Sequence, residues 1–274
     1  MPIESAGISG LVMPIEIAGL RDGRFDSFGV NTWVSVPPDV GSASFGMLKD
    51  SAVRSFSGTV SLDTVYRKMD EWASGVLSAA KSGSCRLELS SRYVQTVSGN
   101  SQKDLDYIDV AFAILRSATG GSKYLMSVAV SGFNACPCTM SHTSQILGVS
   151  PDSTGRRISV THNQRTRLKA RIESPSVPEF DFRRIGDLLR DSMGGRLREL
   201  AGDVEEANVV IHAHENPGLI EDVVRKAAIG VSMEPLVDGS AVLIVEGRSL
   251  ESIHHHNAYA RVRQKVSDLR SLSA

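Results

Sequence analysis

Leu105-Asp-Tyr-Ile-Asp-Val-Ala-Phe-Ala-Ile-Leu115 begins with alternating apolar and polar residues and ends in an apolar run, and a second such run extends from Tyr124 to Phe133. Alternation at every second residue, together with aromatic and β-branched side chains, indicates β-strands. Gly120-Gly121 lies between the two runs, and glycine pairs are typical of tight hairpin turns. We therefore predict a β-hairpin at the centre of the chain.

Outside this hairpin, apolar periodicity predicts both strands and helices. Strands are expected at residues 31–36, 86–93, 160–172 and 241–246. Helices are expected through the apolar positions of residues 62–77, 182–189 and 219–228, with Pro217 in the first turn of the last one. Residues 141–157 are polar and rich in Gly, Ser and Asp, which predicts a long loop.

This order of elements indicates an α+β protein made of two similar halves. Each half is expected to contain an antiparallel sheet with helices packed on one face. We predict that residues 1–125 form the first half and residues 126–274 the second, related by an internal pseudo-repeat. The second half contains all seven histidines and two of the three cysteines, so the metal chemistry is expected there.

The composition is that of an ordinary globular protein, with 41% hydrophobic and 22% charged residues in 274. Thirty basic against 31 acidic residues leave a formal charge of −1, which provides no overall field for nucleic acid or an anionic membrane. An anionic substrate would therefore need a local basic site. No secretory signal or transmembrane segment is recognisable, so we expect a cytoplasmic protein.

Cys136-Pro137-Cys138 directly follows the apolar run that ends at Phe133, at the point where a strand is expected to lead into a loop. Three cysteines cannot all pair, and thiols in a reducing compartment are more often metal ligands or nucleophiles. The alternative is that both cysteines are small buried apolar side chains. The downstream His162 favours the functional interpretation.

Two further clusters contain potential ligands. On an extended segment, His254 and His256 would point to the same side and His255 to the other, although a solvated polar corner is the alternative. The second cluster combines carboxylates with histidines, and its carboxylates have the alternative role of exposed charges at helix starts. Its members are Glu205, Glu206, His212, His214, Glu215, Glu221 and Asp222.

Four motifs in a fixed order resemble the GTP cyclohydrolases of type IB, including the archaeal methanopterin-pathway branch. They are Cys136-Pro-Cys138, Thr161-His-Asn-Gln-Arg165, Glu215-Asn-Pro217 with Glu221-Asp-Val-Val-Arg225, and Glu251-Ser-Ile-His254 with His256-Asn-Ala-Tyr-Ala260. The resemblance implies a tunnelling fold, in which chains associate into a homo-oligomer, a dimer or tetramer, with active sites at the interfaces.

The resemblance also implies one divalent metal ion per site, Fe(II), zinc or manganese. Cys136, Glu206 and His254 correspond to its ligands, and His162 is either a further ligand or a proton carrier. Such a mixed set of sulfur, nitrogen and oxygen donors is typical of catalytic rather than structural sites.

Other positions correspond to groups that hold the substrate or transfer protons. His256 is a candidate general acid or base, and Cys138 is a second thiol in the same cavity. Glu221 would accept hydrogen bonds from the N–H edge of the purine. Arg165 would contact phosphate, with a plain salt bridge as the alternative.

The implied reaction is hydrolysis of GTP at guanine C8 with loss of formate. It gives a 7,8-dihydroneopterin phosphate, a triphosphate or a 2′,3′-cyclic phosphate, for folate or methanopterin biosynthesis. One departure concerns residues 44–54, which lack a histidine that family members usually carry and offer Lys49 or Arg54 instead. The alternatives are therefore an enzyme acting on another purine or pterin, or a non-catalytic metal-binding homologue.

Overall fold

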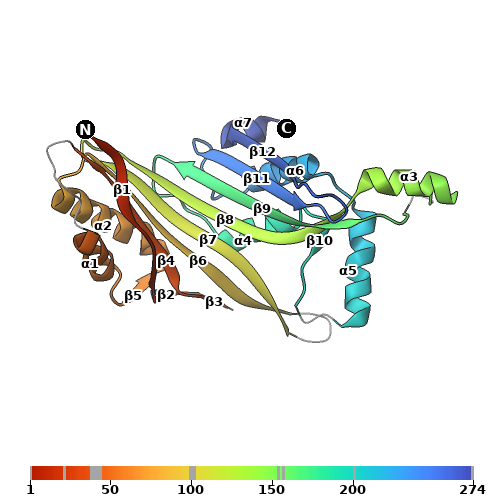
Figure 1. Ribbon diagram of the computed structural model, residues 1–274, viewed down its shortest axis with the longest axis horizontal. Coiled ribbons are helices and arrows are strands. Elements are labelled where there is room, and N and C mark those ends of the chain that lie inside the picture. Colours follow the sequence, from red (N-terminus) through yellow and green to blue (C-terminus); the bar gives the residue numbers. More distant parts are fainter. Residues whose placement is uncertain are drawn as a thin grey trace. The chain divides into compact units, whose positions relative to one another are not determined.

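The computed structural model describes residues 2–20, 23–37, 45–98, 103–152, 155, 158–199 and 202–272 (Figure 1). Contacts within the chain group the residues into two compact units. Unit 1 comprises Met1–Gln95, Tyr107–Ser127 and Ile172–Glu179, and unit 2 comprises Thr96–Asp106, Val128–Arg171 and Phe180–Ala274. The predicted division into residues 1–125 and 126–274 stays a prediction.

The structure is a mixture of helices and a large, mainly antiparallel sheet, as the sequence predicts. The first elements are β1 (Ile3–Met13), β2 (Glu16–Ala18), β3 (Gly23–Phe25), β4 (Phe28–Val36), α1 (Phe45–Ser55), β5 (Thr59–Ser61), the 3₁₀ turn η1 (Leu62–Thr64), α2 (Val65–Ala80), β6 (Ser84–Ser98), β7 (Lys103–Ser117) and β8 (Ser122–Ala135). They are followed by α3 (Pro137–Leu147), β9 (Asn163–Ser174), α4 (Phe182–Arg190), β10 (Gly195–Arg196), α5 (Asp203–Glu215), α6 (Ile220–Ser232), β11 (Val242–Leu250), β12 (Ala258–Lys265) and α7 (Val266–Ser271).

In unit 1 the strand order is β1-β4-β6-β7-β8, and β4 pairs antiparallel with both β1 and β6. Helix α2 buries the apolar stripe that the sequence predicts, including Trp72, whose Nε1 donates to Ser51 Oγ of α1 at 3.0 Å. The predicted hairpin is confirmed between β7 and β8. Gly120 and Gly121 have φ values of 107° and 89°, which side chains other than glycine rarely adopt.

In unit 2 the strand order is β8-β9-β11-β12, and α6 packs against β11 and β12. Gly247 of β11 permits this packing, because a Cβ there would lie 2.6 Å from Val224 and 2.7 Å from Ile220, both on α6. The same Cβ would lie 3.1 Å from Leu168 of β9. Gly247 and Leu168 therefore face α6, and their immediate neighbours along each strand point to the opposite side of the sheet.

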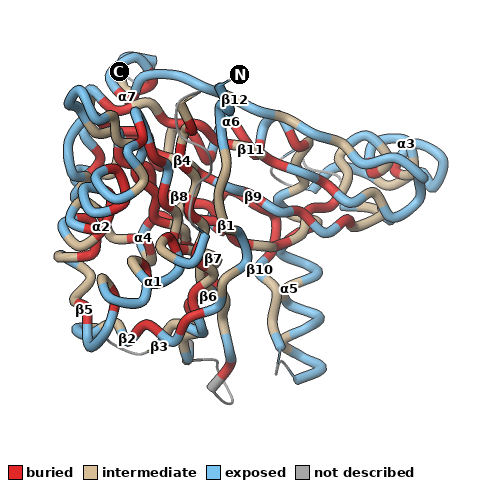
Figure 2. The backbone as a smooth tube through the Cα atoms, turned by 60° about the vertical axis from the view of Figure 1, so that its left-hand side comes forward, coloured by how far each residue is buried: buried red, intermediate tan, exposed pale blue. Residues whose placement is uncertain are grey.

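The predicted loop at residues 141–157 is wrong at its start, because residues 141–147 belong to α3. This helix buries only Met140 and Ser144, so it has no apolar stripe for the sequence to display. Its ends stabilise it instead, with Pro137 in the first turn and Gly148 in the left-handed conformation at φ 65°. Figure 2 shows α3 as largely exposed.

The predicted start of α6 is also corrected, since the helix begins at Ile220 and Pro217 lies before it rather than in its first turn. The remaining predicted strands and helices are present within a few residues of the expected positions. Among the described residues, no helix combines the length and the apolar character needed to cross a membrane.

We predict that Gly247→Ala lowers the free energy of unfolding by about 1–3 kcal/mol, because the new methyl group must displace side chains of α6. Gly230→Ala is the matched control. Gly230 lies within α6, where a Cβ would have Leu188 as its nearest neighbour at 3.8 Å, so alanine is expected to add about 0.5–1 kcal/mol. Urea unfolding measures both changes. Equal effects of the two substitutions would contradict the packing of α6 on β11.

Candidate active site

Cys136 lies at the point where β8 ends and α3 begins, as the N-cap residue of the helix. Its backbone N–H donates to the carbonyl of His162 at 3.1 Å, and its own carbonyl accepts from Thr161 Oγ1 at 2.8 Å. These two bonds hold the first and second sequence motifs together. The side chain of Thr161 is a positioning group that the sequence alone did not single out, although it lies within a recognised motif.

Three histidines gather beside this junction. The ring centroids of His162 and His254 are 6.3 Å apart, and the rings of His254 and His256 stack at 4.9 Å with 13° between their planes. Ser252 Oγ lies 3.4 Å from His162 Nδ1. The His254 and His256 rings thus lie side by side, but the segment bends between β11 and β12 instead of being extended, so the strand alternation on which the prediction is based does not apply there.

Asn134, at the end of β8, is 2% exposed and links this strand to β9 and to the residue before β10. Its Nδ2 donates to Thr166 Oγ1 at 2.9 Å, and its Oδ1 accepts from the backbone N–H of Gly194 at 2.7 Å. The next residue, Ala135, accepts from the N–H of Gly218 at 3.2 Å. The segment that leads into α6 is therefore fixed beside the Cys136 junction. The only sequence signal for Asn134 was a polar residue at the end of an apolar strand.

The other predicted site residues are exposed. Cys138 lies on the first turn of α3, Arg165 on β9, Glu206 on α5 and Glu221 on the first turn of α6. Among the described residues, no hydrogen bond or ion pair joins Glu206 to Cys136 or to the three histidines. Among the residues that the structure describes, no group of three or more His, Cys, Asp or Glu side chains is arranged to hold a metal ion. The chain by itself brings together residues of three of the four motifs around His162, and it holds the segment of the remaining motif nearby through Gly218.

A cavity of about 470 Å³ in unit 2 is lined by residues around β10 and α5, including Gly194 and His212. Three arginines line it, and each is paired with carboxylates. Arg190 lies 2.7 Å from Asp106, Arg196 lies 2.5 Å from Asp191, and Arg198 lies 3.0 Å from Asp104. Burial lowers the pKa of Arg190, and the nearby carboxylates of Asp106 and Asp187 oppose that shift. The positive charge of this cavity is therefore largely neutralised by its own walls.

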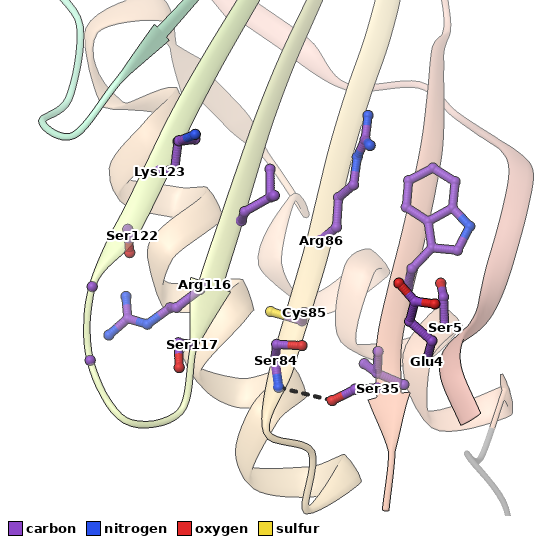
Figure 3. A pocket seen from close by; sticks show the side chains of 15 residues that line it. Glu4, Ser5, Ser35, Ser84, Cys85, Arg86, Arg116, Ser117, Ser122 and Lys123 are labelled. Atoms are coloured by element: carbon purple, nitrogen blue, oxygen red, sulfur yellow. Dashed lines mark hydrogen bonds between the residues drawn. The ribbon is translucent and has the colours of Figure 1, made fainter. Parts of the chain in front are cut away.

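A second cavity of about 470 Å³ lies in unit 1, and Figure 3 shows its lining from close by. It contains Trp33, Arg86, Arg116 and Lys123, but none of the predicted site residues. Cys85, which also lines it, is 4% exposed, and burial raises the pKa of its thiol to about 11. This cysteine is an inert structural thiol rather than a nucleophile.

Residues 1–260 match the family model described as type I GTP cyclohydrolase folE2. The chain belongs to this family. The predicted resemblance is confirmed, and the family's class of enzyme, a GTP cyclohydrolase, is the class that the motifs indicated. The match extends from the first residue through the His254–His256 segment, so it contains all four motifs.

Among its relatives, the GTP cyclohydrolase MptA of Aeropyrum pernix is 32% identical over 186 residues, which are 67% of this chain and 63% of that protein. The alignment thus spans less than two thirds of that relative. The GTP cyclohydrolase MptA of Picrophilus torridus is 26% identical over 276 residues, 99% of this chain and 93% of that protein. Uricase from Arthrobacter globiformis aligns with a TM-score of 0.49 and 8% identity over 95% of this chain and 93% of that one, too distant to support a functional inference.

We predict that alkylation of the folded protein at about pH 8 modifies Cys138 readily and Cys85 only after unfolding. Cys138 is exposed, whereas Cys85 combines burial with a pKa of about 11. Peptide mass spectrometry checks the order of modification. Because the folded state raises this pKa above 9.0, deprotonation of Cys85 opposes folding, so its contribution to stability is lost as the pH rises from about 9 through 11. Alkylation of both thiols at equal rates in the native protein would contradict the assignment.

Proposed function

We propose that this chain hydrolyses GTP at guanine C8 and releases formate. The product is a 7,8-dihydroneopterin phosphate, as the triphosphate or the 2′,3′-cyclic phosphate, for folate or methanopterin biosynthesis in the cytoplasm. The observation that carries the proposal is the junction at Cys136, where a backbone hydrogen bond joins Cys136 to His162 and the rings of His162 and His254 have their centroids 6.3 Å apart. These residues come from separate motifs of the GTP cyclohydrolase family to which the chain belongs.

The thiol and imidazoles at this junction are donor types that suit a divalent metal, iron, zinc or manganese, but the described residues of one chain do not form a group of three donors there. Cys136 and His254 are proposed as ligands together with Glu206, and His162 as a fourth ligand or a proton carrier. A half-buried thiol and two imidazoles on adjoining segments are suitable donors for these ions. A cation held there supplies the Lewis acidity that activates water toward C8 of the guanine ring.

The chain's own groups then have to move protons and orient the purine. His256 stacks on His254 at 4.9 Å, so a proton carried by His256 stays beside the proposed ligand. Cys138 presents its exposed thiol on the first turn of α3. Glu221 is proposed to accept two charge-assisted hydrogen bonds from the N–H edge of guanine, and Arg165 to contact phosphate.

The proposed site residues Cys138, Glu206 and Glu221 are exposed, which supports a homo-oligomer, a dimer or tetramer, with sites completed at interfaces. Helix α5 carries Glu206 and also exposes Val204 at 75% and Ile211 at 53%. Helix α3 carries Cys138 and exposes Ile146 at 82% and Leu147 at 61%. Apolar side chains on site-bearing helices are typical of surfaces that a partner chain buries.

We predict that Cys136→Ala and His254→Ala each abolish turnover while the circular dichroism spectrum is unchanged, since each removes a proposed metal ligand. The assay incubates purified protein with GTP and Fe(II), Zn(II) or Mn(II) and measures formate and, after oxidation, a fluorescent pterin. His255→Ala is the control, because this exposed neighbour has no proposed role. Full activity in either ligand variant would refute the ligand assignment, and no turnover with any metal would refute the proposed function.

We further predict that Glu221→Gln lowers kcat/KM for GTP by about 10- to 100-fold, because a neutral amide cannot make the same charge-assisted hydrogen bonds. Asp222→Asn is the matched control. Asp222 is the adjacent exposed carboxylate and pairs only at the surface with Arg225, at 2.7 Å, so its loss is expected to matter little. Equal losses in both variants would remove Glu221 from the substrate site.

A second candidate is an enzyme that acts on another purine or pterin. The segment 44–54, which departs from the family pattern, favours it. Its described part forms most of α1, where Lys49 and Arg54 are exposed. Steady-state rates for a panel of purine nucleotides distinguish the two, and metal binding without any turnover would indicate a non-catalytic homologue.

A further inference from the structure

Strand β9 carries a row of positive charges along one face. Within unit 2 its exposed positions are Arg165, Arg167 and Lys169, followed by the half-buried Arg171, whereas the residues between them are buried. Side chains alternate between the two faces of a strand, so these four cations share a face. With about 3.3 Å per residue, the row extends over roughly 20 Å.

The packing of α6 identifies which face this is. Leu168 lies between Arg167 and Lys169 in sequence. Its side chain lies on the same side of Gly247 as Val224 and Ile220 of α6, because all three would contact a Cβ built on that glycine. The buried positions of β9 therefore face the helix. The four cations point to the side of the sheet that α6 does not cover.

Neighbouring strands add more positive charge to the same face. Opposite residues of an antiparallel pair lie on one side of the sheet, and Arg248 of β11 is opposite Tyr259 of β12. Since Gly247 faces α6, Arg248 points away from it. The same register places three cations of β12 on this side, namely Arg261, Arg263 and Lys265.

We call this surface the basic face: four cations from β9, one from β11 and three from β12. All residues of these strands in unit 2 are described, and among those on this face Glu246 is the one carboxylate. It is held by Arg261 at 2.9 Å. Glu173, farther along β9, belongs to unit 1 and lies 3.7 Å from Lys123. The whole chain has a formal charge of −1, so this local excess is not a consequence of composition.

The basic face is continuous with the candidate active site. β9 begins at Asn163, directly after His162, and β12 begins at Ala258, two residues after His256. Both strands therefore lead away from the stacked histidines with their cations on one side. The arginines that line the unit 2 cavity are paired with carboxylates, whereas Lys169, Arg248 and Lys265 have no ion pair among the described residues.

We propose that the basic face collects the triphosphate group of the nucleotide and guides it to the site at the start of β9. A surface of one charge sign raises the local concentration of an oppositely charged ligand and its rate of encounter, and salt screens the effect. This inference rests on the proposed function and adds a group of guiding residues to it. A triphosphate nucleotide has the complementary charge, and the basic face ends at the site that is proposed to bind it.

The kinetic test neutralises three guiding residues that the site does not use, as Lys169→Gln, Arg248→Gln and Lys265→Gln in one variant. At low ionic strength, kcat/KM for GTP is expected to fall by about three- to tenfold while kcat is unchanged. The difference in kcat/KM between this variant and wild type is expected to disappear at roughly 0.5 M salt, where ions screen charges that are more than a few ångströms apart.

The control variant carries the same charge change elsewhere, as Arg24→Gln, Lys81→Gln and Lys226→Gln, at exposed positions outside the basic face. Equal kcat/KM and equal salt dependence in the two variants would overturn the inference, while the proposed function would stand.

A binding test does not depend on turnover. Titration calorimetry with inorganic tripolyphosphate at low salt is expected to show weaker binding to the basic-face variant than to wild type, with the control unchanged. If GTP is not turned over but this loss is seen, the basic face is a triphosphate site and the proposed function fails. If tripolyphosphate binding is equal in all three proteins, or if only single-stranded DNA binding is lost, the inference is overturned.

Discussion

The pairing of Cys136 with Thr161 and His162 is the constraint on which the candidate site depends. Two hydrogen bonds join the end of β8 to the segment before β9, and they replace strand pairing at the point where the backbone turns into α3. Ala135 extends this junction by accepting from Gly218. Backbone groups buried at such a turn need partners, so the same bonds that satisfy them also bring distant motifs together.

The two faces of the unit 2 sheet have different tasks. One face is covered by α6 and is close-packed. A residue with a Cβ at position 247 would clash with Val224 and Ile220, so glycine is needed there. The opposite face carries the cations of β9 and β12 and borders the histidines. Because alternation ties both faces to one backbone, the apolar residues that fix α6 also fix the direction of the positive charges.

Carboxylates are distributed unequally among the cations of unit 2. Arg190 is 3% exposed and lies between Asp106 and Asp187, which compensate the cost of burying it. On the basic face a single carboxylate accompanies several cations. The first arrangement stabilises the structure around β10 and α5, whereas the second is the local excess of positive charge on which the proposed guidance of the nucleotide depends.

The sequence by itself determined the strands around Gly120-Gly121, the helix that buries Trp72 and the types of donor side chain, because apolar periodicity and turn residues are local signals. It did not indicate α3, since that helix is stabilised at its ends rather than by an apolar face. The alternation of cations with other residues at positions 165–171 is enough to place the β9 cations on one side once the strand is assigned. Only the tertiary structure decided that His162 lies beside His254 and that Arg263 and Lys265 join the β9 row. These relations depend on strand register and on backbone hydrogen bonds between segments distant in sequence, which no local pattern specifies.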